Sequence, residues 1–323
     1  MTKFPSKSEI IDTHETLRSA VVKTPAIDGR DLLAGTEITL ASLTLKNEMF
    51  QKSGSFKYRG AINVMLSMSE SERKKGVVAF SGGNHAIAVA RVAHDLGISA
   101  KVIMPETADE VRVSKCEKLG AEVFLVKERA EAPRLASSIV ESEGRTLVPP
   151  FEHYRTIAAT ASLGYEFWRQ QEDLDYVLMA IGGGGLAAGV SCAIRQFSPR
   201  CKIIGVQPRS ADAMFRSRRS GHVEANEKVD TIADSLCPPQ VGSLTLEACR
   251  LFLDDIVIVE EPDIKLAMVA LYETFKLVVE GAAAVPLAAV LSQRIKIPSS
   301  ANVGLILGGS SISISKFAHQ TDL

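Results

Sequence analysis

Short apolar runs rich in β-branched residues alternate with helical patterns along most of the chain, and this alternation constrains the fold most. Val77–Phe80 reads as a buried strand, Asn84–Leu96 as a helix ended by Gly97, and Lys101–Met104 as the next strand. Strands joined by helices form parallel sheets through right-handed crossovers, and the helices cover the sheet faces. The sequence therefore predicts an α/β fold with parallel, helix-covered sheets.

The same patterns continue to the end of the chain. Further strands are predicted at Val123–Val126, Leu147–Val148, Tyr176–Ile181, Ile203–Val206, Ile256–Val259 and Val303–Leu307. Further helices are predicted at Asp109–Leu119, Pro133–Glu143, Leu186–Phe197, Ile264–Val279 and Ala282–Arg294. Because 323 residues exceed one ordinary core and no long linker interrupts the pattern, we expect a small domain inserted in a larger one.

Charge and composition exclude several classes of protein. The 37 basic and 38 acidic residues give a net charge of -1, which argues against a nucleic-acid-binding role. No apolar run reaches the ~18–20 residues of a membrane span, and the polar N-terminus lacks a secretory pattern. Five cysteines without CxxC spacing indicate reduced thiols and predict neither disulfides nor zinc, so we expect a cytoplasmic protein.

The first of three chemistry-bearing segments places a lysine after small residues and before a helical pattern. It reads Ser53-Gly54-Ser55-Phe56-Lys57-Tyr58-Arg59-Gly60-Ala61. The positive end of a helix dipole lowers the pKa of a nearby amine and favours its neutral, nucleophilic form. Lys57 is therefore a candidate nucleophile, although a surface lysine beside a loop would show the same pattern.

The second segment is a small-residue turn between a predicted strand and a predicted helix. It comprises Ser81, Gly82, Gly83, Asn84 and His85. Backbone N–H groups at a helix N-terminus form a concave anion site that suits a carboxylate. Asn84 could also donate from its amide to a ring hydroxyl, or could simply cap the helix.

The third segment is a run of four glycines directly after a predicted strand, Gly182, Gly183, Gly184 and Gly185, followed by Leu186. Such a loop can wrap a phosphate with N–H donors while the helix dipole favours the negative charge. The run also fits a loose dinucleotide pattern, but the next strand ends at Gln207-Pro208 without the acidic residue that a ribose requires. A nicotinamide-dependent dehydrogenase is therefore a disfavoured alternative.

A lysine, a carboxylate site and a phosphate loop together suggest pyridoxal phosphate held as a Schiff base. The chain resembles the fold-type-II pyridoxal phosphate enzymes, in the serine/threonine dehydratase and serine racemase branch. The resemblance is carried by the order and the sequences of four segments, residues 53–61, 81–85, 182–186 and 280–284. The resemblance covers nearly the whole chain. It implies two open, twisted, mostly parallel sheets, with a small domain at 76–148 inserted in a large cofactor-binding domain formed by 1–75 and 149–323.

The resemblance also implies roles for individual residues. Lys57 would bind the cofactor covalently and serve as the catalytic base, and Phe56 would pack on the cofactor ring. The phosphate would lie on Gly182, Gly183, Gly184, Gly185 and the Leu186 amide, and the ring hydroxyl on Asn84. The substrate carboxylate would be bound by Ser81, Gly82, Gly83, Asn84 and His85.

The chain departs from the family pattern at four places. At the family's metal loop, Gln207 and Ala213 replace two carboxylates and Asp212 lies one position away, so we predict no metal site. Gly308 or Leu307 occupies the position of the usual partner of the pyridine nitrogen, and Ser310 or Ser311 could replace it. The sequence of residues 157–162 differs from the family's usual motif, which predicts that the pocket wall here differs from that of the family. A second substrate carboxylate would need a cation such as Arg129, Arg134 or Arg155.

These observations predict a pyridoxal phosphate enzyme that performs α,β-elimination on L-threonine, L-serine or a related β-hydroxy amino acid such as 3-hydroxyaspartate. The products would be a 2-oxo acid and ammonia. Because the chain ends soon after Ser311, we expect no regulatory domain and a catabolic role, and relatives are commonly homodimers. Three alternatives remain besides the dehydrogenase: an amino acid racemase, a β-replacement synthase and a non-catalytic ligand-binding relative.

Overall fold

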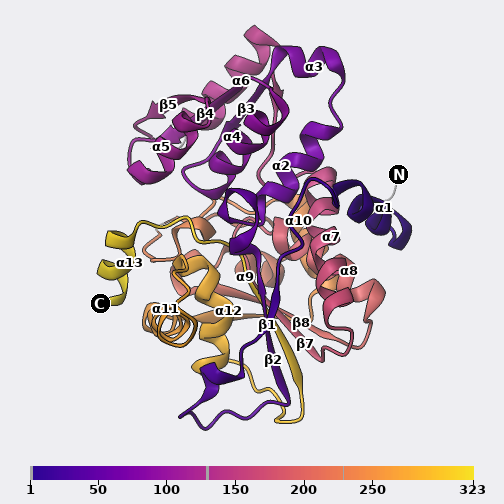
Figure 1. Ribbon diagram of the computed structural model, residues 1–323, viewed down its shortest axis with the longest axis vertical. Helices are drawn as coiled ribbons and strands as arrows, with labels where there is room; N and C mark the ends of the chain where they lie inside the picture. Colours follow the sequence, from indigo (N-terminus) through magenta and orange to yellow (C-terminus); the bar gives the residue numbers. More distant parts are fainter. Residues whose placement is uncertain (1–2, 129–130, 228) are drawn as a thin grey trace.

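The chain folds around two sheets, one above the other in Figure 1. The structure, a computed structural model, describes residues 3–128, 131–227 and 229–323. The larger sheet has the strand order β1-β2-β10-β7-β8-β9, and only the β1–β2 pair is antiparallel. Its strands are β1 (Ala26–Asp28), β2 (Ser42–Asn47), β7 (Tyr176–Ala180), β8 (Lys202–Pro208), β9 (Asp255–Val259) and β10 (Asn302–Leu307).

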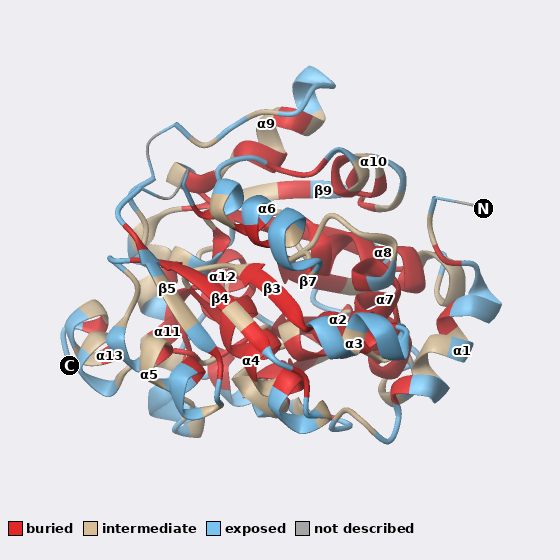
Figure 2. Ribbon diagram, turned by 90° about the horizontal axis from the view of Figure 1, so that it is seen from above, coloured by how far each residue is buried: buried red, intermediate tan, exposed pale blue. Residues whose placement is uncertain are grey.

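The smaller sheet is entirely parallel and has the order β5-β4-β3-β6. Its strands are β3 (Val77–Phe80), β4 (Ala100–Pro105), β5 (Glu122–Val126) and β6 (Thr146–Leu147). Both sheets are covered by helices, and the central strands are buried, as the red strands β3, β4 and β7 in Figure 2 show. The predicted α/β fold with two mostly parallel sheets is confirmed.

The helices lie where the alternating pattern places them, with several that the pattern did not predict. Those of the first half are α1 (Lys7–Leu17), α2 (Lys57–Leu66), α3 (Glu70–Lys75), α4 (Asn84–Leu96), α5 (Glu110–Lys118), α6 (Glu131–Glu143) and α7 (Tyr154–Gln170). Those of the second half are α8 (Gly185–Phe197), α9 (Ala213–Ser220), α10 (Ser243–Phe252), α11 (Glu261–Phe275), α12 (Gly281–Leu291) and α13 (Ile314–Thr321). As predicted, α4 ends at Gly97, which adopts the left-handed conformation that glycine tolerates.

The strands of the smaller sheet all fall within residues 76–148, the segment proposed as the small domain. Helix α2 precedes this segment but shares its apolar core, because Ile62 and Met65 pack in one cluster with Ile87 and Val102. The division into domains therefore stays a proposal, and the small unit has α2 as part of its packing.

Candidate active site

A pocket of about 270 Å³ lies between the two sheets, at the carboxyl ends of their strands. Its lining includes the three chemistry-bearing segments, of which the first and the last are more than 120 residues apart in the sequence: Phe56 and Lys57, Ser81 to His85, and Gly182 to Leu186. Ligands in α/β sheets bind at this edge because strands end and helices begin there. Folding therefore brings together the lysine, the proposed carboxylate site and the proposed phosphate loop.

Lys57 begins α2, and its side chain is half-buried beside Phe56 and Phe151. The Lys57 Nζ donates a hydrogen bond to the Pro150 carbonyl oxygen at 2.7 Å. Burial lowers the pKa of the Lys57 amine to about 8, and the nearby Glu280 carboxylate acts in the opposite direction. Desolvation, more than the helix dipole invoked from the sequence, thus makes a neutral amine accessible near neutral pH.

The tetraglycine loop joins β7 to α8 and fits so tightly that side chains are excluded. A Cβ on Gly183 would lie 2.5 Å from the Phe151 ring, and one on Gly185 would lie 2.6 Å from the Phe151 Cβ. Gly184 has a φ of 92° and caps α8, a conformation that few other residues adopt. Close packing therefore requires these glycines, and the same backbone presents the free N–H groups of a helix N-terminus to the pocket.

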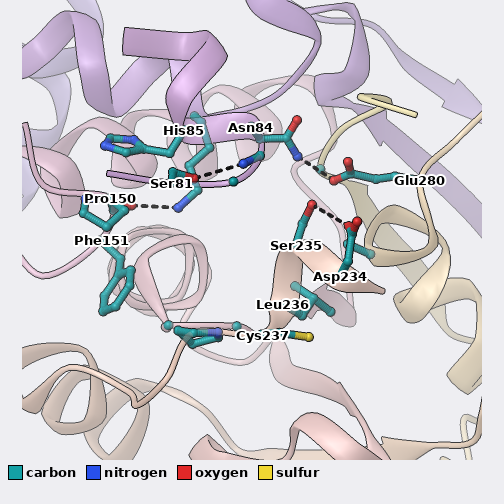
Figure 3. A pocket seen from close by; sticks show the side chains of 18 of the residues that line it. Ser81, Asn84, His85, Pro150, Phe151, Asp234, Ser235, Leu236, Cys237 and Glu280 are labelled. Carbon is teal, nitrogen blue, oxygen red and sulfur yellow. Dashed lines mark hydrogen bonds between the residues drawn. The ribbon is translucent and has the colours of Figure 1, made fainter. Parts of the chain in front are cut away.

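The turn from Ser81 to His85 joins β3 to α4 and presents the N-terminus of α4 to the pocket (Figure 3). The Ser81 Oγ accepts from the Gly83 N–H at 3.2 Å. The His85 Nε2 lies 2.8 Å from the Val148 carbonyl oxygen, which can only accept, so this nitrogen carries a proton. Burial and the Lys57 charge lower the pKa of His85 to about 3, so the ring is neutral and its other nitrogen cannot donate to a carboxylate. His85 could therefore contribute its backbone N–H to an anion but not a ring donor.

Asn84 and Glu280 form a buried polar pair that the sequence motifs alone did not predict. The Asn84 Nδ2 donates to the Glu280 Oε1 at 2.6 Å, as the dashed line in Figure 3 shows. The Asn84 Oδ1 and the Glu280 Oε2 are buried without a hydrogen-bond partner, and the Glu280 Oε2 lies 3.7 Å from the Arg112 Nη2. The second N–H of the Asn84 amide is left to donate to a ring hydroxyl, and the Asn84 Oδ1 is left to accept from one. Such unpartnered atoms in a pocket fit a site built for a bound group.

Three of the sequence-derived candidates lie outside the pocket lining. Ser310 does not line it, whereas Gly308 does, so the structure adds no support to Ser310 as the partner of the pyridine nitrogen. Arg134 and Arg155 are exposed and do not line it, and Arg129 lies outside the described residues. Residues 157–162 lie in α7 and do not line this pocket, but Thr160 lines a small adjoining cavity with Phe56, Lys57 and His85. The Thr160 Oγ1 donates to the Gly185 carbonyl oxygen of the glycine loop, so the prediction of a different pocket wall holds only for this cavity behind Lys57.

The fold and this site define an α/β enzyme that holds a phosphorylated cofactor beside a reactive lysine. A family model described as "pyridoxal-phosphate dependent enzyme" matches residues 17–309, and the chain belongs to this family. Pyridoxal phosphate is therefore its cofactor, and the lysine, the glycine loop and the unpartnered Asn84 oxygen fit that group.

Named relatives are similar over nearly the full chain. A phenylserine dehydratase of Ralstonia pickettii is 38% identical, over 100% of this chain and 98% of that protein. An L-threonine ammonia-lyase of Thermotoga maritima is 38% identical, over 95% of this chain and 75% of that protein. Among solved structures, serine racemase from Dictyostelium discoideum superposes with a TM-score of 0.88 at 32% identity, over 97% of this chain and 100% of that chain.

The loop after β8 gives a physical basis for the prediction of metal independence. The Gln207 Nε2 donates to the carbonyl oxygens of Ile181 and Ala211, and its Oε1 accepts from the Phe215 N–H. Asp212 accepts from Arg216. Within the described residues no group of three or more His, Cys, Asp or Glu side chains could hold a metal ion. The Gln207 amide thus donates hydrogen bonds to two carbonyl oxygens that could otherwise bind a cation.

We therefore expect exhaustive chelation to leave activity and melting temperature almost unchanged. The matched variant is Gln207→Glu, which turns two donated hydrogen bonds into carboxylate–carbonyl repulsion and supplies a hard anionic ligand. This variant should be destabilised and should regain stability with magnesium or calcium. Specific reactivation of the chelated wild-type enzyme by either ion would contradict the prediction.

Proposed function

We propose that this enzyme is an ammonia-lyase that removes water from a β-hydroxy amino acid and releases a 2-oxo acid and ammonia. The observation that carries the proposal is the convergence of Lys57, the Ser81–His85 turn and the tetraglycine loop on one pocket. The names of the relatives support it, because they include phenylserine dehydratase, L-threonine ammonia-lyase and L-threo-3-hydroxyaspartate ammonia-lyase.

We further propose that the enzyme is cytoplasmic, has a catabolic role and forms a homodimer. Within the described part of the chain, no helix is both long and apolar enough to cross a bilayer.

The roles follow from the position of each group. The tetraglycine loop would hold the cofactor phosphate, Asn84 would hydrogen-bond its hydroxyl, and Phe56 would pack on its ring. The α4 N-terminus binds the substrate carboxylate through backbone N–H groups. When bound, pyridoxal phosphate withdraws electrons from the substrate α-carbon. The Lys57 amine, whose pKa is about 8, takes the α-proton, and the β-hydroxyl takes up a proton and leaves as water. The enamine that is released adds one water molecule and gives the 2-oxo acid and ammonia.

A screen for 2-oxo acid release across β-hydroxy amino acids tests the proposal. We expect release from at least one of L-threonine, L-serine, 3-phenylserine and 3-hydroxyaspartate, with equal amounts of ammonia. If none releases a 2-oxo acid while the cofactor is bound, the proposed function is wrong. Nicotinamide binding without a visible cofactor band would instead favour the dehydrogenase alternative.

The racemase alternative depends on Gly82. Racemisation needs a second acid–base group on the side opposite Lys57, and relatives with that activity are expected to have a serine at this position. Gly82 has no side chain, and the Ser81 Oγ already accepts from the Gly83 N–H. A Cβ on Gly82 would lie 3.1 Å from the Pro105 ring, so a serine there fits only if Pro105 shifts slightly.

We expect D-serine formation from L-serine to be about a hundredfold or more slower than elimination, because one acid–base group is missing. Chiral chromatography of the wild type and of Gly82→Ser measures it, and Gly82→Ala controls for the added Cβ. A gain in the serine variant alone would support the argument. D-serine formation by the wild type at a rate close to that of elimination would refute it.

A further inference from the structure

One wall of the pocket is apolar and is not used by the groups assigned above. It is formed by the carboxyl ends of β3 and β4 and by the starts of α5 and α6, with lining residues Phe80, Ile103, Pro105, Ala108, Ala132 and Pro133. Ile103 and Ala132 belong to one buried apolar cluster, and Phe80 packs against it. The short side chains of Ala108 and Ala132 leave space for a substituent at this wall, and Phe80 contributes an aromatic ring to it.

The apolar wall adjoins the proposed carboxylate site. A Cβ built on Gly82 would lie 3.1 Å from the Pro105 ring and 4.0 Å from the Ala108 Cβ. In an amino acid the carboxylate and the side chain are attached to the same carbon atom. A substrate whose carboxylate lies on the 81–85 turn therefore has Pro105 and Ala108 within reach of its C3 substituent.

Among the described residues, the cations that line the pocket, other than Lys57, are paired. The Arg112 guanidinium donates to both Asp234 carboxylate oxygens at 3.1 Å, and the Lys316 Nζ donates to Asp234 at 2.8 Å. Arg112 also donates to the Ser311 and Gly82 carbonyl oxygens, and its Nη2 lies 3.7 Å from Glu280.

The charged lining residues of the described chain are balanced, with Lys57, Arg112 and Lys316 against Asp109, Asp234 and Glu280. A second substrate carboxylate would thus meet apolar side chains and paired charges, where an unpaired anion is costly.

We propose that the enzyme selects 3-hydroxy amino acids with a bulky apolar substituent at C3, above all an aromatic ring, and that it discriminates against a second carboxylate. An aromatic ring buries more apolar surface on this wall than the methyl group of threonine and can pack edge to face with Phe80. Asp234 enforces the exclusion by pairing with both Arg112 and Lys316, and Glu280 provides a second carboxyl group beside Arg112. This inference rests on the proposed elimination and specifies its substrate class.

Turnover gives the first test. The kcat/KM for L-threo-3-phenylserine should exceed that for L-threonine about tenfold or more, and that for 3-hydroxyaspartate should be lowest. A value for phenylserine at or below that for threonine overturns the inference, while elimination itself stands. Absence of 2-oxo acid from all three substrates would instead refute the proposed function.

Binding gives a second test that does not depend on elimination. L-Phenylalanine and L-aspartate lack the leaving hydroxyl, so calorimetry reports only their affinity for the wild-type holoenzyme. L-Phenylalanine should bind about tenfold or more tightly than L-aspartate. Equal or weaker binding of L-phenylalanine overturns the inference.

Asp234→Asn tests the role of the ion pairs. Releasing Arg112 and Lys316 should improve L-aspartate binding about tenfold and leave L-phenylalanine binding nearly unchanged. The matched control is Asp212→Asn, which breaks an aspartate–arginine pair outside the pocket and should change neither affinity. Ala132→Arg adds a cation to the apolar wall itself and should likewise shift the binding preference toward L-aspartate. If both pocket variants keep the wild-type ratio of affinities, charge pairing does not set the specificity.

Discussion

Replacing Lys57 by alanine should abolish elimination and the visible absorption band of lysine-linked cofactor. Among the described residues, Lys57 is the one lysine that lines the pocket next to both Phe56 and Phe151, and burial lowers the pKa of its amine to about 8. The general-base role alone accounts for a loss of about 10²–10⁴-fold, and loss of the covalent attachment adds to it. Borohydride reduction followed by peptide mapping identifies the lysine independently of activity.

Lys52→Ala is the matched control, because Lys52 directly precedes the same segment but does not line the pocket. It should retain the absorption band and near wild-type turnover. Cofactor attachment to apoprotein should accelerate about tenfold per pH unit below pH 8 and level off above it, since the neutral amine attacks the aldehyde. Near wild-type turnover of Lys57→Ala without added amines, or mapping of the cofactor to another lysine, would refute the assignment.

Replacing Arg59 by methionine should cost about 3–5 kcal/mol of unfolding free energy, because it leaves buried carboxylates uncompensated. Arg59 is fully buried two residues after Lys57. Its guanidinium donates twice to Glu48 at 2.8 Å and twice to Glu166 at 3.1 Å. Lys46, also fully buried, donates to Glu166 as well. This cluster ties the start of α2 to the end of β2 and to α7, and thereby holds Lys57 against the pocket.

Urea denaturation measures this effect, with Lys74→Met as the control. Lys74 pairs with Glu70 on the exposed face of α3, where an ion pair contributes at most about 0.5 kcal/mol. Arg59→Lys keeps the charge but not the planar, two-sided donor geometry, so it should fall between Arg59→Met and the wild type. A loss below about 1 kcal/mol in Arg59→Met would show that the cluster does not stabilise the fold as argued.

The local signals in the sequence predicted the strand–helix alternation because most of these strands are buried on both faces. Such strands read as continuous apolar runs bounded by turn residues, as Val77–Phe80 does. The pattern missed β2 and α7. In β2 the polar residues Thr44 and Lys46 alternate with leucines although both faces of the strand are buried, and α7 begins with polar residues and is rich in alanine and threonine. Both are stabilised by contacts that are distant in sequence, such as the Lys46–Glu166 pair across 120 residues.

By itself, the sequence determined the α/β class and identified Lys57 and the tetraglycine loop as candidates for the nucleophile and the anion site, since each depends on residue types at short spacing. The tertiary structure alone decided what surrounds them. Glu280 and Asp234 meet Asn84 and Arg112 only because the two sheets face each other across the pocket. The same packing makes His85 neutral and leaves Arg134 and Arg155 exposed outside the lining. Hydrogen-bond direction, burial and charge pairing depend on chain segments more than 100 residues apart, which no local pattern encodes.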